Sequence, residues 1–241
     1  MKKITYDIES NVERSHWWFT GRRRLLQCII SSLSIRRDSL AVDVGCGVGS
    51  NLAFLKSMGL RVIGIDSEMY GLSLAKTISG GPLVNGDLLK LPIKSDSIDL
   101  MIATDIFEHM DDDVLGMKEI YRVLKPGGKA IITVPAFMFL WGIQDRVGMH
   151  KRRYTKKEFL KKIESESFII MKSSYFNFLL FFPIFLTRRM IRLLGLKIES
   201  ENRINFPVIN FFLKVLFGLE PWLLRYFSSP FGVSIFCVAK K

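Results

Sequence analysis

The chain has few of the residues that mark disulfide-bonded, metal-binding or membrane-spanning proteins. Its three cysteines, Cys28, Cys46 and Cys237, are an odd count without metal-ligand spacing, so we expect free thiols and no bound metal. The first residues are basic but lack the apolar stretch of a secretory signal. No apolar run reaches the ~18–20 residues of a membrane-spanning helix, and we find no internal repeat. These absences favour a protein of a reducing compartment, and we expect it to be cytoplasmic.

Positive charge is concentrated in the second half of the chain. Residues 1–135 carry 17 Lys and Arg and 16 Asp and Glu, whereas residues 136–241 carry 18 and 7. The second half is also rich in phenylalanine, since 12 of the 19 lie between Phe168 and Phe231. Basic and aromatic residues together favour an anionic partner beside an apolar one. An acidic lipid surface fits both properties, and nucleic acid fits the first better than the second.

The centre of the chain alternates between apolar strands and helices. The expected strands are 40–44, 61–66, 82–87, 98–104, 129–135, 168–175 and 232–240. The expected helices between them are 50–58, 70–78, 114–124 and 156–166. Near-continuous apolar strands between helices predict an α/β, doubly wound, Rossmann-like fold with a mostly parallel seven-stranded sheet covered on both faces. Ligands of such folds bind at the carboxyl ends of the strands.

The remaining parts of the chain flank or interrupt this core. We expect a helical cap at residues 1–38, the cofactor-binding core at 39–175 and the last core strand at 232–241. The core fold does not need residues 176–231, which are rich in Phe and basic residues. We interpret them as a helical insertion whose apolar face covers the active site, enters the surface of a bilayer, or both.

A glycine-rich loop follows the first expected strand. Gly45, Gly47 and Gly49 alternate there, and Asp43 lies two residues before the first of them. Such glycines let a ligand approach the backbone, and the helix that follows offers free N–H groups. The third glycine comes one place earlier than in the dinucleotide pattern G-x-G-x-x-G. The Asp43 carboxylate favours a ligand with an ammonium or sulfonium group over a pyrophosphate. A plain strand-to-helix turn is the alternative.

Four further motifs follow this loop in order. They are Gly64-Ile65-Asp66, Asn85-Gly86-Asp87, Asp105-Ile106-Phe107-Glu108-His109-Met110 and Leu124-Lys125-Pro126-Gly127-Gly128. With these motifs in register, the stretch from Leu40 to Pro135 resembles the class I S-adenosylmethionine-dependent methyltransferases, of the small-molecule type similar to ubiquinone-biosynthesis enzymes. The resemblance implies transfer of a methyl group from S-adenosylmethionine, with S-adenosylhomocysteine as the product.

The resemblance implies a role in cofactor binding for each motif. The expected ligands of the aminoacyl end are Asp43, Gly45, Cys46, Gly47 and Gly49. Asp66, with Ser67, would bind the ribose hydroxyls, or Asp66 could instead cap the helix near Tyr70. Asp87 and the Leu88 backbone would contact adenine, or Asp87 could be a turn aspartate. Thr104 and Asp105 would lie beside the methyl group.

A segment near the start of the chain lies outside these motifs. Ser15–Arg24 holds two tryptophans, a histidine and three arginines. An N-terminal helix often closes over the cofactor in this fold, so the resemblance adds Trp18 and Arg23 to the expected cofactor ligands. An amphipathic surface helix is the alternative.

A second such segment, Phe139–Tyr154, follows the fifth expected strand and so lies on the ligand side of the sheet. It offers acid–base groups at Asp145, His150 and Tyr154. It also offers cations for an anionic acceptor at Lys151, Arg152 and Arg153. The alternative is a solvated basic loop.

The expected catalytic residues are His109, Asp145 and His150. In methyl transfer from a sulfonium the protein mainly positions the reactants and excludes water, but an oxygen acceptor with a high pKa also needs a base. We expect His150 or His109 as that base, with Asp145 orienting either, whereas a carbon or nitrogen acceptor needs no strong base. His109 could instead be structural, its cation favoured by the aspartates at 111–113.

Three classes of function are compatible with the sequence. We expect a methyltransferase that acts on a small amphiphilic or lipid-linked acceptor, as a peripheral protein at the cytoplasmic face of the membrane. The alternative is an RNA- or protein-modifying methyltransferase that uses the basic half as an anion groove. Nucleic acid is the weaker choice because the Asn/Asp-Pro-Pro-Tyr signature and paired catalytic cysteines are absent. A non-catalytic binding module is the third class, and the sequence leaves the oligomeric state open.

Overall fold

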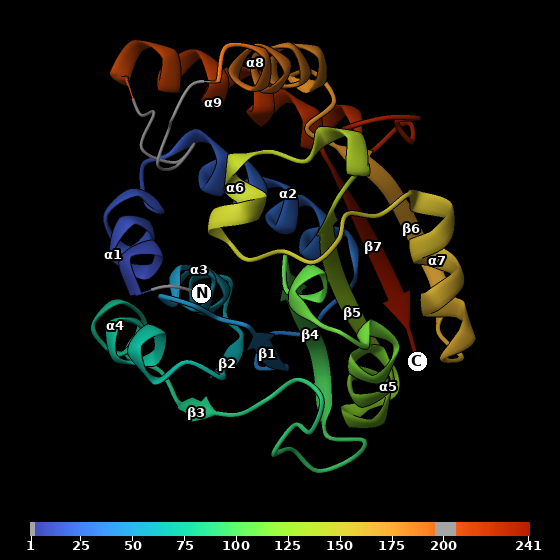
Figure 1. Ribbon diagram of the computed structural model, residues 1–241. Coiled ribbons are helices and arrows are strands. Elements are labelled where there is room, and N and C mark those ends of the chain that lie inside the picture. The colour runs from blue at the N-terminus through green and yellow to red at the C-terminus, as the bar shows by residue number, and fades with distance from the viewer. Residues whose placement is uncertain (1–2, 196–205) are drawn as a thin grey trace.

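The computed structural model describes residues 3–195 and 206–241. Its middle layer is a seven-stranded sheet with the order β3-β2-β1-β4-β5-β7-β6 (Figure 1). The strands are β1 (Leu40–Val44), β2 (Arg61–Asp66), β3 (Leu83–Asn85), β4 (Ile98–Thr104), β5 (Leu124–Pro135), β6 (Ile169–Phe176) and β7 (Ser234–Lys240). β7 is antiparallel to both neighbours and the other adjacent pairs are parallel. The predicted α/β fold is therefore confirmed, and the strand order reverses between β1 and β4, where such sheets bind ligands.

Helices cover both faces of the sheet (Figure 1). Those of eight residues or more are α1 (Lys3–Val12), α2 (Trp17–Ser32), α3 (Ser50–Ser57), α4 (Met69–Ser79), α5 (Asp113–Val123), α7 (Lys156–Ser165), α8 (Phe181–Leu193) and α9 (Pro207–Leu223). Alternate residues of β4 enter two separate cores. Met101 and Ala103 pack on the side of α5 and α7, whereas Leu100 and Ile102 pack on the side of α2, α3 and α9. This alternation explains why β4 is apolar from Leu100 to Ala103.

The sequence placed most elements within a few residues of their observed ends, and β5 is the largest exception. We expected Lys125–Gly128 to end a helix before a strand at 129, but β5 already begins at Leu124. Leu124 pairs with Ile98, and the register shifts between Ile98 and Leu100. Gly127 has a φ of 82°, which a glycine adopts easily. The Pro-Gly-Gly segment thus forms an irregularity within the strand.

The glycine loop has the backbone that its sequence predicts. Gly47 and Gly49 have φ values of 53° and 84°. A Cβ at Gly49 would lie 2.9 Å from the Cβ of Ala75, so only glycine lets α3 approach α4 this closely. A Cβ at Gly47 would meet nothing within 4 Å. The loop is therefore tightly packed at one glycine and open at another.

The N-terminal cap and the insertion pack on each other. Gly21 of α2 lies against Phe217 of α9, since a Cβ there would be 2.1 Å from the Phe217 ring. Trp18 stacks on Phe176 and on Phe217, with ring centroids 5.9 Å and 5.6 Å apart. Asn210 of α9 accepts a hydrogen bond of 2.7 Å from the Trp17 backbone N–H. These contacts fix α9 to the start of α2, beside the carboxyl end of the sheet.

The insertion contributes α8 and α9, which lie at the top of the molecule in Figure 1. Within the expected insertion at 176–231, residues 196–205 lie outside the described residues. None of the helices in residues 3–195 and 206–241 has the length and apolar content needed to cross a bilayer.

Candidate functional site

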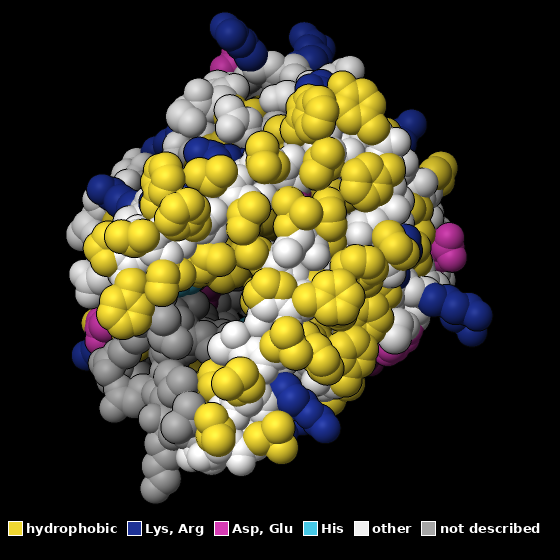
Figure 2. Space-filling model, turned by 90° about the horizontal axis from the view of Figure 1, so that it is seen from above, with side chains coloured by type: hydrophobic (Ala, Val, Ile, Leu, Met, Phe, Trp, Pro, Cys, Tyr) yellow, Lys and Arg dark blue, Asp and Glu magenta, His cyan; other side chains and the backbone are white. Residues whose placement is uncertain are grey.

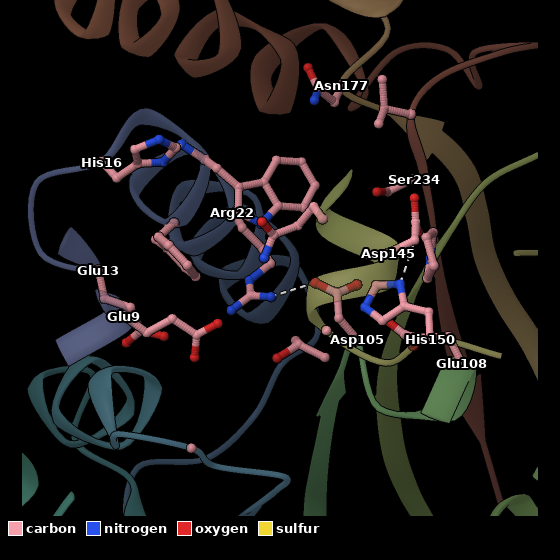
Figure 3. A pocket seen from close by; sticks show the side chains of 18 of the residues that line it. Glu9, Glu13, His16, Arg22, Asp105, Glu108, Asp145, His150, Asn177 and Ser234 are labelled. Atoms are coloured by element: carbon pink, nitrogen blue, oxygen red, sulfur yellow. Dashed lines mark hydrogen bonds and ion pairs between the residues drawn. The ribbon is translucent and has the colours of Figure 1, made fainter. Parts of the chain in front are cut away.

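A cavity of about 230 Å³ lies at the carboxyl ends of β1 and β4 (Figure 3). The glycine loop, α1, α2, the turn after β4, the segment after β5 and α8 all contribute to its wall. Its charged and histidine residues are Glu9, Glu13, His16, Arg22, Asp105, Glu108, His109, Asp145, His150, Arg153 and Arg188. The cavity thus joins the predicted cofactor loop to all three predicted catalytic residues.

The glycine loop forms one end of this cavity. Gly45, Cys46 and Gly47 line it, and Gly47 is the glycine that leaves open space. Behind the loop, the Asp43 carboxylate is fully buried and neither oxygen has a hydrogen-bond partner of normal geometry. Burial raises the pKa of Asp43 to about 7, although Arg22 opposes this shift. Asn51 and Arg22 also act on this carboxylate, and a buried carboxylate next to an open backbone loop fits a ligand that carries a positive charge.

Asp66 ends β2 beside the same loop but does not line the cavity. One of its carboxylate oxygens accepts a hydrogen bond of 2.8 Å from the Gly47 N–H, and the other accepts one of 2.9 Å from the Glu68 N–H. Glu68, not Asp66, is the N-cap residue of α4, so the helix-cap alternative is wrong. Its neighbour Ser67 is exposed. Asp66 therefore supports the glycine loop, and its role toward a ribose stays a prediction.

Asp87 and Leu88 lie outside the cavity as well. Asp87 is exposed, and its carboxylate accepts a hydrogen bond of 2.9 Å from the Leu89 N–H. This is the geometry of a turn aspartate. The Leu88 side chain is buried in the core. A contact from either residue to adenine stays a prediction.

Helix α1 lies next to this part of the sheet. Tyr6 is buried, and a Cβ at Gly71 of α4 would be 2.7 Å from its ring. Burial raises the pKa of Tyr6, and the Asp66 carboxylate adds to the effect. Glu9 of α1 and Glu13, the residue after that helix, both line the cavity. The cap therefore covers the end of β2 with carboxylates.

Arg22 provides the main link between α2 and the sheet. Its Nη1 lies 2.5 Å from the Oδ2 of Asp105, the residue after β4, and both side chains line the cavity (Figure 3). Thr104, which precedes Asp105, lines it too. The predicted ligand Arg23 does not: its Nη2 donates to the Glu13 carbonyl oxygen at 2.6 Å. Of the two predicted cap residues, Trp18 lines the cavity and Arg23 lies outside it.

The three predicted catalytic residues lie together at the other end. The Nδ1 of His150 is 2.9 Å from the Oδ1 of Asp145, and the rings of His109 and His150 are nearly perpendicular with centroids 4.8 Å apart. Burial, aided by His150, lowers the pKa of His109 to about 4. The expectation that the aspartates at 111–113 favour its cation is therefore wrong, because burial outweighs them.

Most other polar side chains of Phe139–Tyr154 form hydrogen bonds or ion pairs with other residues of the protein. Tyr154 is fully buried and donates to Asp113 at 2.8 Å, so it cannot act as an acid–base group in the cavity. Lys151 pairs with Asp111 at 2.6 Å, and Arg152 pairs with Asp113 at 3.5 Å. The prediction that these two side chains bind an anionic acceptor is therefore not supported, because each is paired with an aspartate of the protein. Arg153 pairs with Asp145 at 2.7 Å and lines the cavity.

Several cavity residues were missed from the sequence. Glu108 lies within a recognised motif but was not singled out, and Arg22 was passed over for its neighbour Arg23. The spacing of four between Glu9 and Glu13 was the one local signal that could have placed both on one helix face. Arg188 of α8 carries no such signal, because only the packing of the insertion brings it to the cavity.

A glycine loop that opens on a cavity, a buried carboxylate behind it and a strand order that reverses at this point define a Rossmann-like enzyme for a nucleoside-bearing cofactor. Residues 42–132 match the family model described as a methyltransferase domain. This match covers less than half of the chain and agrees with the resemblance of its motifs to the class I S-adenosylmethionine-dependent methyltransferases, whose cofactor is S-adenosylmethionine. The buried Asp43 carboxylate and the open Gly47 fit such a cationic cofactor.

Known proteins resemble this chain over its central part in sequence and over most of its length in fold. It is 34% identical over 145 residues to a demethylmenaquinone methyltransferase of Staphylococcus carnosus, a match that covers 55% of this chain and 58% of that protein. The chain spans about three fifths of the length of the curated relatives it matches.

Two solved structures show the same fold at low sequence identity. A Haloferax volcanii protein solved in complex with the Trm112 methyltransferase activator has a TM-score of 0.65 and 18% identity, with 98% of this chain and 94% of that chain covered. The Haemonchus contortus phosphoethanolamine N-methyltransferase 2, solved with S-adenosyl-L-methionine, has a TM-score of 0.59 and 19% identity, with 90% and 52% covered.

Proposed function

We propose that this chain transfers a methyl group from S-adenosylmethionine to a small amphiphilic or lipid-linked acceptor, which enters the cavity from the apolar face of α8 and α9. One observation carries the proposal. The cavity that joins the glycine loop to His150 is walled by Ile184 and Arg188 of α8, and the outer side of that helix is apolar and exposed. The opening and the apolar face thus belong to the same insertion.

The apolar face is large for a surface of a folded protein. Phe182, Leu186, Met190 and Leu193 of α8 are each more than half exposed, as are Phe211, Phe212 and Trp222 of α9. Figure 2 shows hydrophobic side chains gathered over this side of the molecule, with Lys and Arg at its margin. The surface is hollowed there, and acidic and histidine side chains are visible in the hollow. Such a patch supports contact with lipid or with an apolar ligand.

The charges around this face suit an acidic lipid surface. Arg189 and Arg192 of α8 and Arg225 after α9 are exposed beside the apolar residues. Basic residues flanking an apolar helical face are typical of proteins that bind the membrane interface. We therefore extend the proposal to a peripheral protein at the inner face of the membrane. Residues 1–38 would be a helical cap and residues 176–231 the insertion that contacts the acceptor or the membrane, on a core of residues 39–175 and 232–241.

In the proposed reaction, the cofactor supplies a methyl group on a sulfonium, and the protein binds both reactants, excludes water and accepts the proton. Asp43 and the glycine loop would hold the aminoacyl end, and the aromatic residues of α2 and α8 would exclude water. His150, oriented by Asp145, would take or share the acceptor proton if the acceptor atom is oxygen. The demethylmenaquinone methyltransferase relative is consistent with an acceptor of this amphiphilic kind.

The alternative acceptor, a nucleic acid or protein, has less support. An anion groove needs free cations, but Lys151 and Arg152, which lie closest in sequence to the catalytic residues, are paired with Asp111 and Asp113. The apolar residues of α8 and α9 would also have no partner in such a complex.

Sedimentation with vesicles tests the membrane part of the proposal. We expect the protein to bind phosphatidylcholine vesicles weakly and those with added phosphatidylglycerol strongly. Phe211→Asp combined with Phe212→Asp should weaken binding by about 100-fold, because each buried Phe contributes ~1.5–3 kcal/mol. Leu115→Asp, at an exposed apolar residue of α5 away from this face, is the matched control. Equal binding by all three proteins, or no binding to either vesicle, would reject a membrane surface.

A further inference from the structure

Three side chains that can ligate a metal converge at the catalytic end of the cavity. In the described part of the chain, Glu108, His109 and His150 each offer one ligand atom, and these atoms lie within 4.8 Å of one another. Glu108 and His109 come from the turn after β4, and His150 comes from the loop after the short helix α6 (Ile143–Val147). All three line the cavity, and Figure 3 shows Glu108 close to His150.

Glu108 has an unusual environment for a carboxylate. Its side chain is fully buried, yet neither oxygen has a hydrogen-bond partner. The Nε2 of His150 lies 3.8 Å from its Oε1. Taking a carboxylate out of water without compensation is costly, so buried carboxylates are normally paired or bound to a metal. Glu108 therefore lines the cavity with a buried carboxyl group whose charged form a bound cation would stabilise.

Each of the two histidine rings also forms a hydrogen bond of the kind that orients metal-binding histidines. The Nδ1 of His150 is hydrogen-bonded to Asp145, and the backbone of Met149 hydrogen-bonds the ring of His109. Metal-ligating histidines almost always use their second ring nitrogen for such a bond to a carboxylate or a backbone carbonyl. Asp145 is itself fixed, because it accepts hydrogen bonds from the Gly142 N–H at 2.6 Å and from Arg153 at 2.7 Å.

Gly148 packs closely against the Nε2 of His150. A Cβ at Gly148 would lie only 2.8 Å from its Nε2, so any larger residue there would displace the ring. Metal–ligand bonds of ~2.0–2.1 Å in a tetrahedral site require the most widely spaced donor atoms, now within 4.8 Å of one another, to approach by about 1.5 Å. That is within the reach of side-chain rotation.

We propose that Glu108, His109 and His150 bind a divalent transition metal ion, such as Zn²⁺ or Fe²⁺, which takes an oxygen of the methyl acceptor as a further ligand. Two histidines and one carboxylate are typical of catalytic metal sites that keep open positions. The sequence did not predict this site, because its ligands come from two segments about 40 residues apart. The role toward the acceptor rests on the proposed function, whereas metal binding does not.

A metal at this place would decide the chemical class of the acceptor. A bound metal lowers the pKa of a coordinated hydroxyl by several units. With His150 bound to the metal, the acceptor hydroxyl would lose its proton to water instead of to His150. Its oxygen would form the bond to the methyl carbon, and the sulfur–methyl bond of the sulfonium would break to give the thioether. The site thus favours an acidic hydroxyl, such as that of a phenol or a hydroxyquinone.

Titration of the metal-free protein with Co²⁺, without cofactor or acceptor, tests the site. We expect one Co²⁺ per chain, with visible absorption bands of a nitrogen- and oxygen-ligated ion. Glu108→Gln, His109→Asn and His150→Asn should each lower the affinity by at least about 10-fold, and Asp145→Asn by about 10-fold. Gly148→Ala should weaken binding while keeping every ligand. His16→Asn is the control, because His16 lines the same cavity but caps α2 with its ring.

Two outcomes would overturn the metal site. One is a protein that binds no Co²⁺, and the other is binding that survives in His109→Asn and in His150→Asn, each shown to be folded by its thermal unfolding. Should one variant fail to fold, the other and Gly148→Ala still decide. Tight Co²⁺ binding without methyl transfer to any amphiphile would reject the proposed function alone. Methyl transfer that a chelator leaves unchanged would reject the metal alone.

Discussion

Arg22, which is buried, and Asp105, which is partly buried, form an ion pair with 2.5 Å between Nη1 and Oδ2, and this pair joins the N-terminal cap to the end of β4. Asp105 also accepts a hydrogen bond of 3.0 Å from Thr133 of β5. Burial alone would lower the pKa of Arg22, but the carboxylates of Asp105 and Glu13 outweigh it and raise the pKa. The Arg22–Asp105 pair therefore lies between the part of the cavity lined by the glycine loop and the part lined by the predicted catalytic residues.

Arg22→Gln should destabilise the protein by about 3 kcal/mol, because breaking a buried pair leaves an uncompensated charge. It should also weaken S-adenosylmethionine binding, since the cap would no longer be held at the cavity. Urea unfolding and calorimetric titration measure the two effects. Arg23→Gln is the matched control: Arg23 lies outside the cavity, so the cofactor affinity should not change. A larger loss of affinity in Arg23→Gln than in Arg22→Gln would contradict this picture and favour the ligand first predicted.

Cofactor affinity should depend on pH through Asp43. Its pKa is raised to about 7 by burial in the cofactor-free protein, and the carboxylates of Glu13 and Asp66 add to the shift while Arg22 opposes it. A cationic ligand prefers the ionised form, so S-adenosylmethionine should bind about 10-fold more weakly for each pH unit below about 7. Calorimetric titrations between pH 5.5 and 8.5, roughly the range around that pKa, would show it. A slope that persists in Asp43→Asn would assign the titration to another group.

Gly21→Ala should destabilise the protein although alanine is the better helix former by ~1 kcal/mol. The added methyl group would lie 2.1 Å from the Phe217 ring and force α9 away from α2. Overpacking of this kind costs ~1–3 kcal/mol. Thermal unfolding of Gly21→Ala, Phe217→Leu and the double variant measures the coupling between the two sites. We expect the double variant to be more stable than the sum of the single effects, and strict additivity would speak against the α2–α9 contact.

The free energy of unfolding should fall as the pH rises toward the pKa of Glu220 in the folded protein. This residue of α9 is buried, and burial raises its pKa to about 7 from 4.5. Between these two values the folded state keeps a proton that the unfolded state releases, so stability is lost as the pH increases, by about 3 kcal/mol in all. Glu220→Gln should therefore stabilise the protein at pH 8, roughly one unit above that pKa, and change little near pH 5. Glu164→Gln, at an exposed residue, should have no such effect at either pH.

The sequence predicts the fold well because each core strand carries its own signal. β4 is apolar from Leu100 to Ala103, so burial of this stretch on both faces follows from its composition, and Gly49 must be glycine where α3 meets α4. Lys125–Gly128 was assigned as a helix stop because Pro and Gly disfavour both regular structures. Only the pairing of Leu124 with Ile98 shows that the strand begins earlier.

The cavity is less predictable because its residues come from segments that only tertiary packing brings together. The sequence could select His109, Asp145 and His150, since each lies in or near a segment expected at the ligand side of the sheet. It could not choose Arg22 over Arg23, because the choice depends on which face of α2 packs against Phe217. Nor could it foresee that Tyr154 is held by Asp113, or that Glu108 lies beside His150 without a hydrogen-bond partner.

Transfer of tritium from methyl-labelled S-adenosylmethionine would distinguish a lipid-phase acceptor from a macromolecule. The purified protein would be incubated with membranes, RNA and soluble protein from the source organism, and the label would be measured after separation into organic and aqueous phases. We expect label in the organic phase, reduced in Asp43→Asn and in the Phe211→Asp and Phe212→Asp double variant. Label found only in RNA or protein, at the same level in the double variant, would contradict an amphiphilic acceptor reached from the face of α8 and α9.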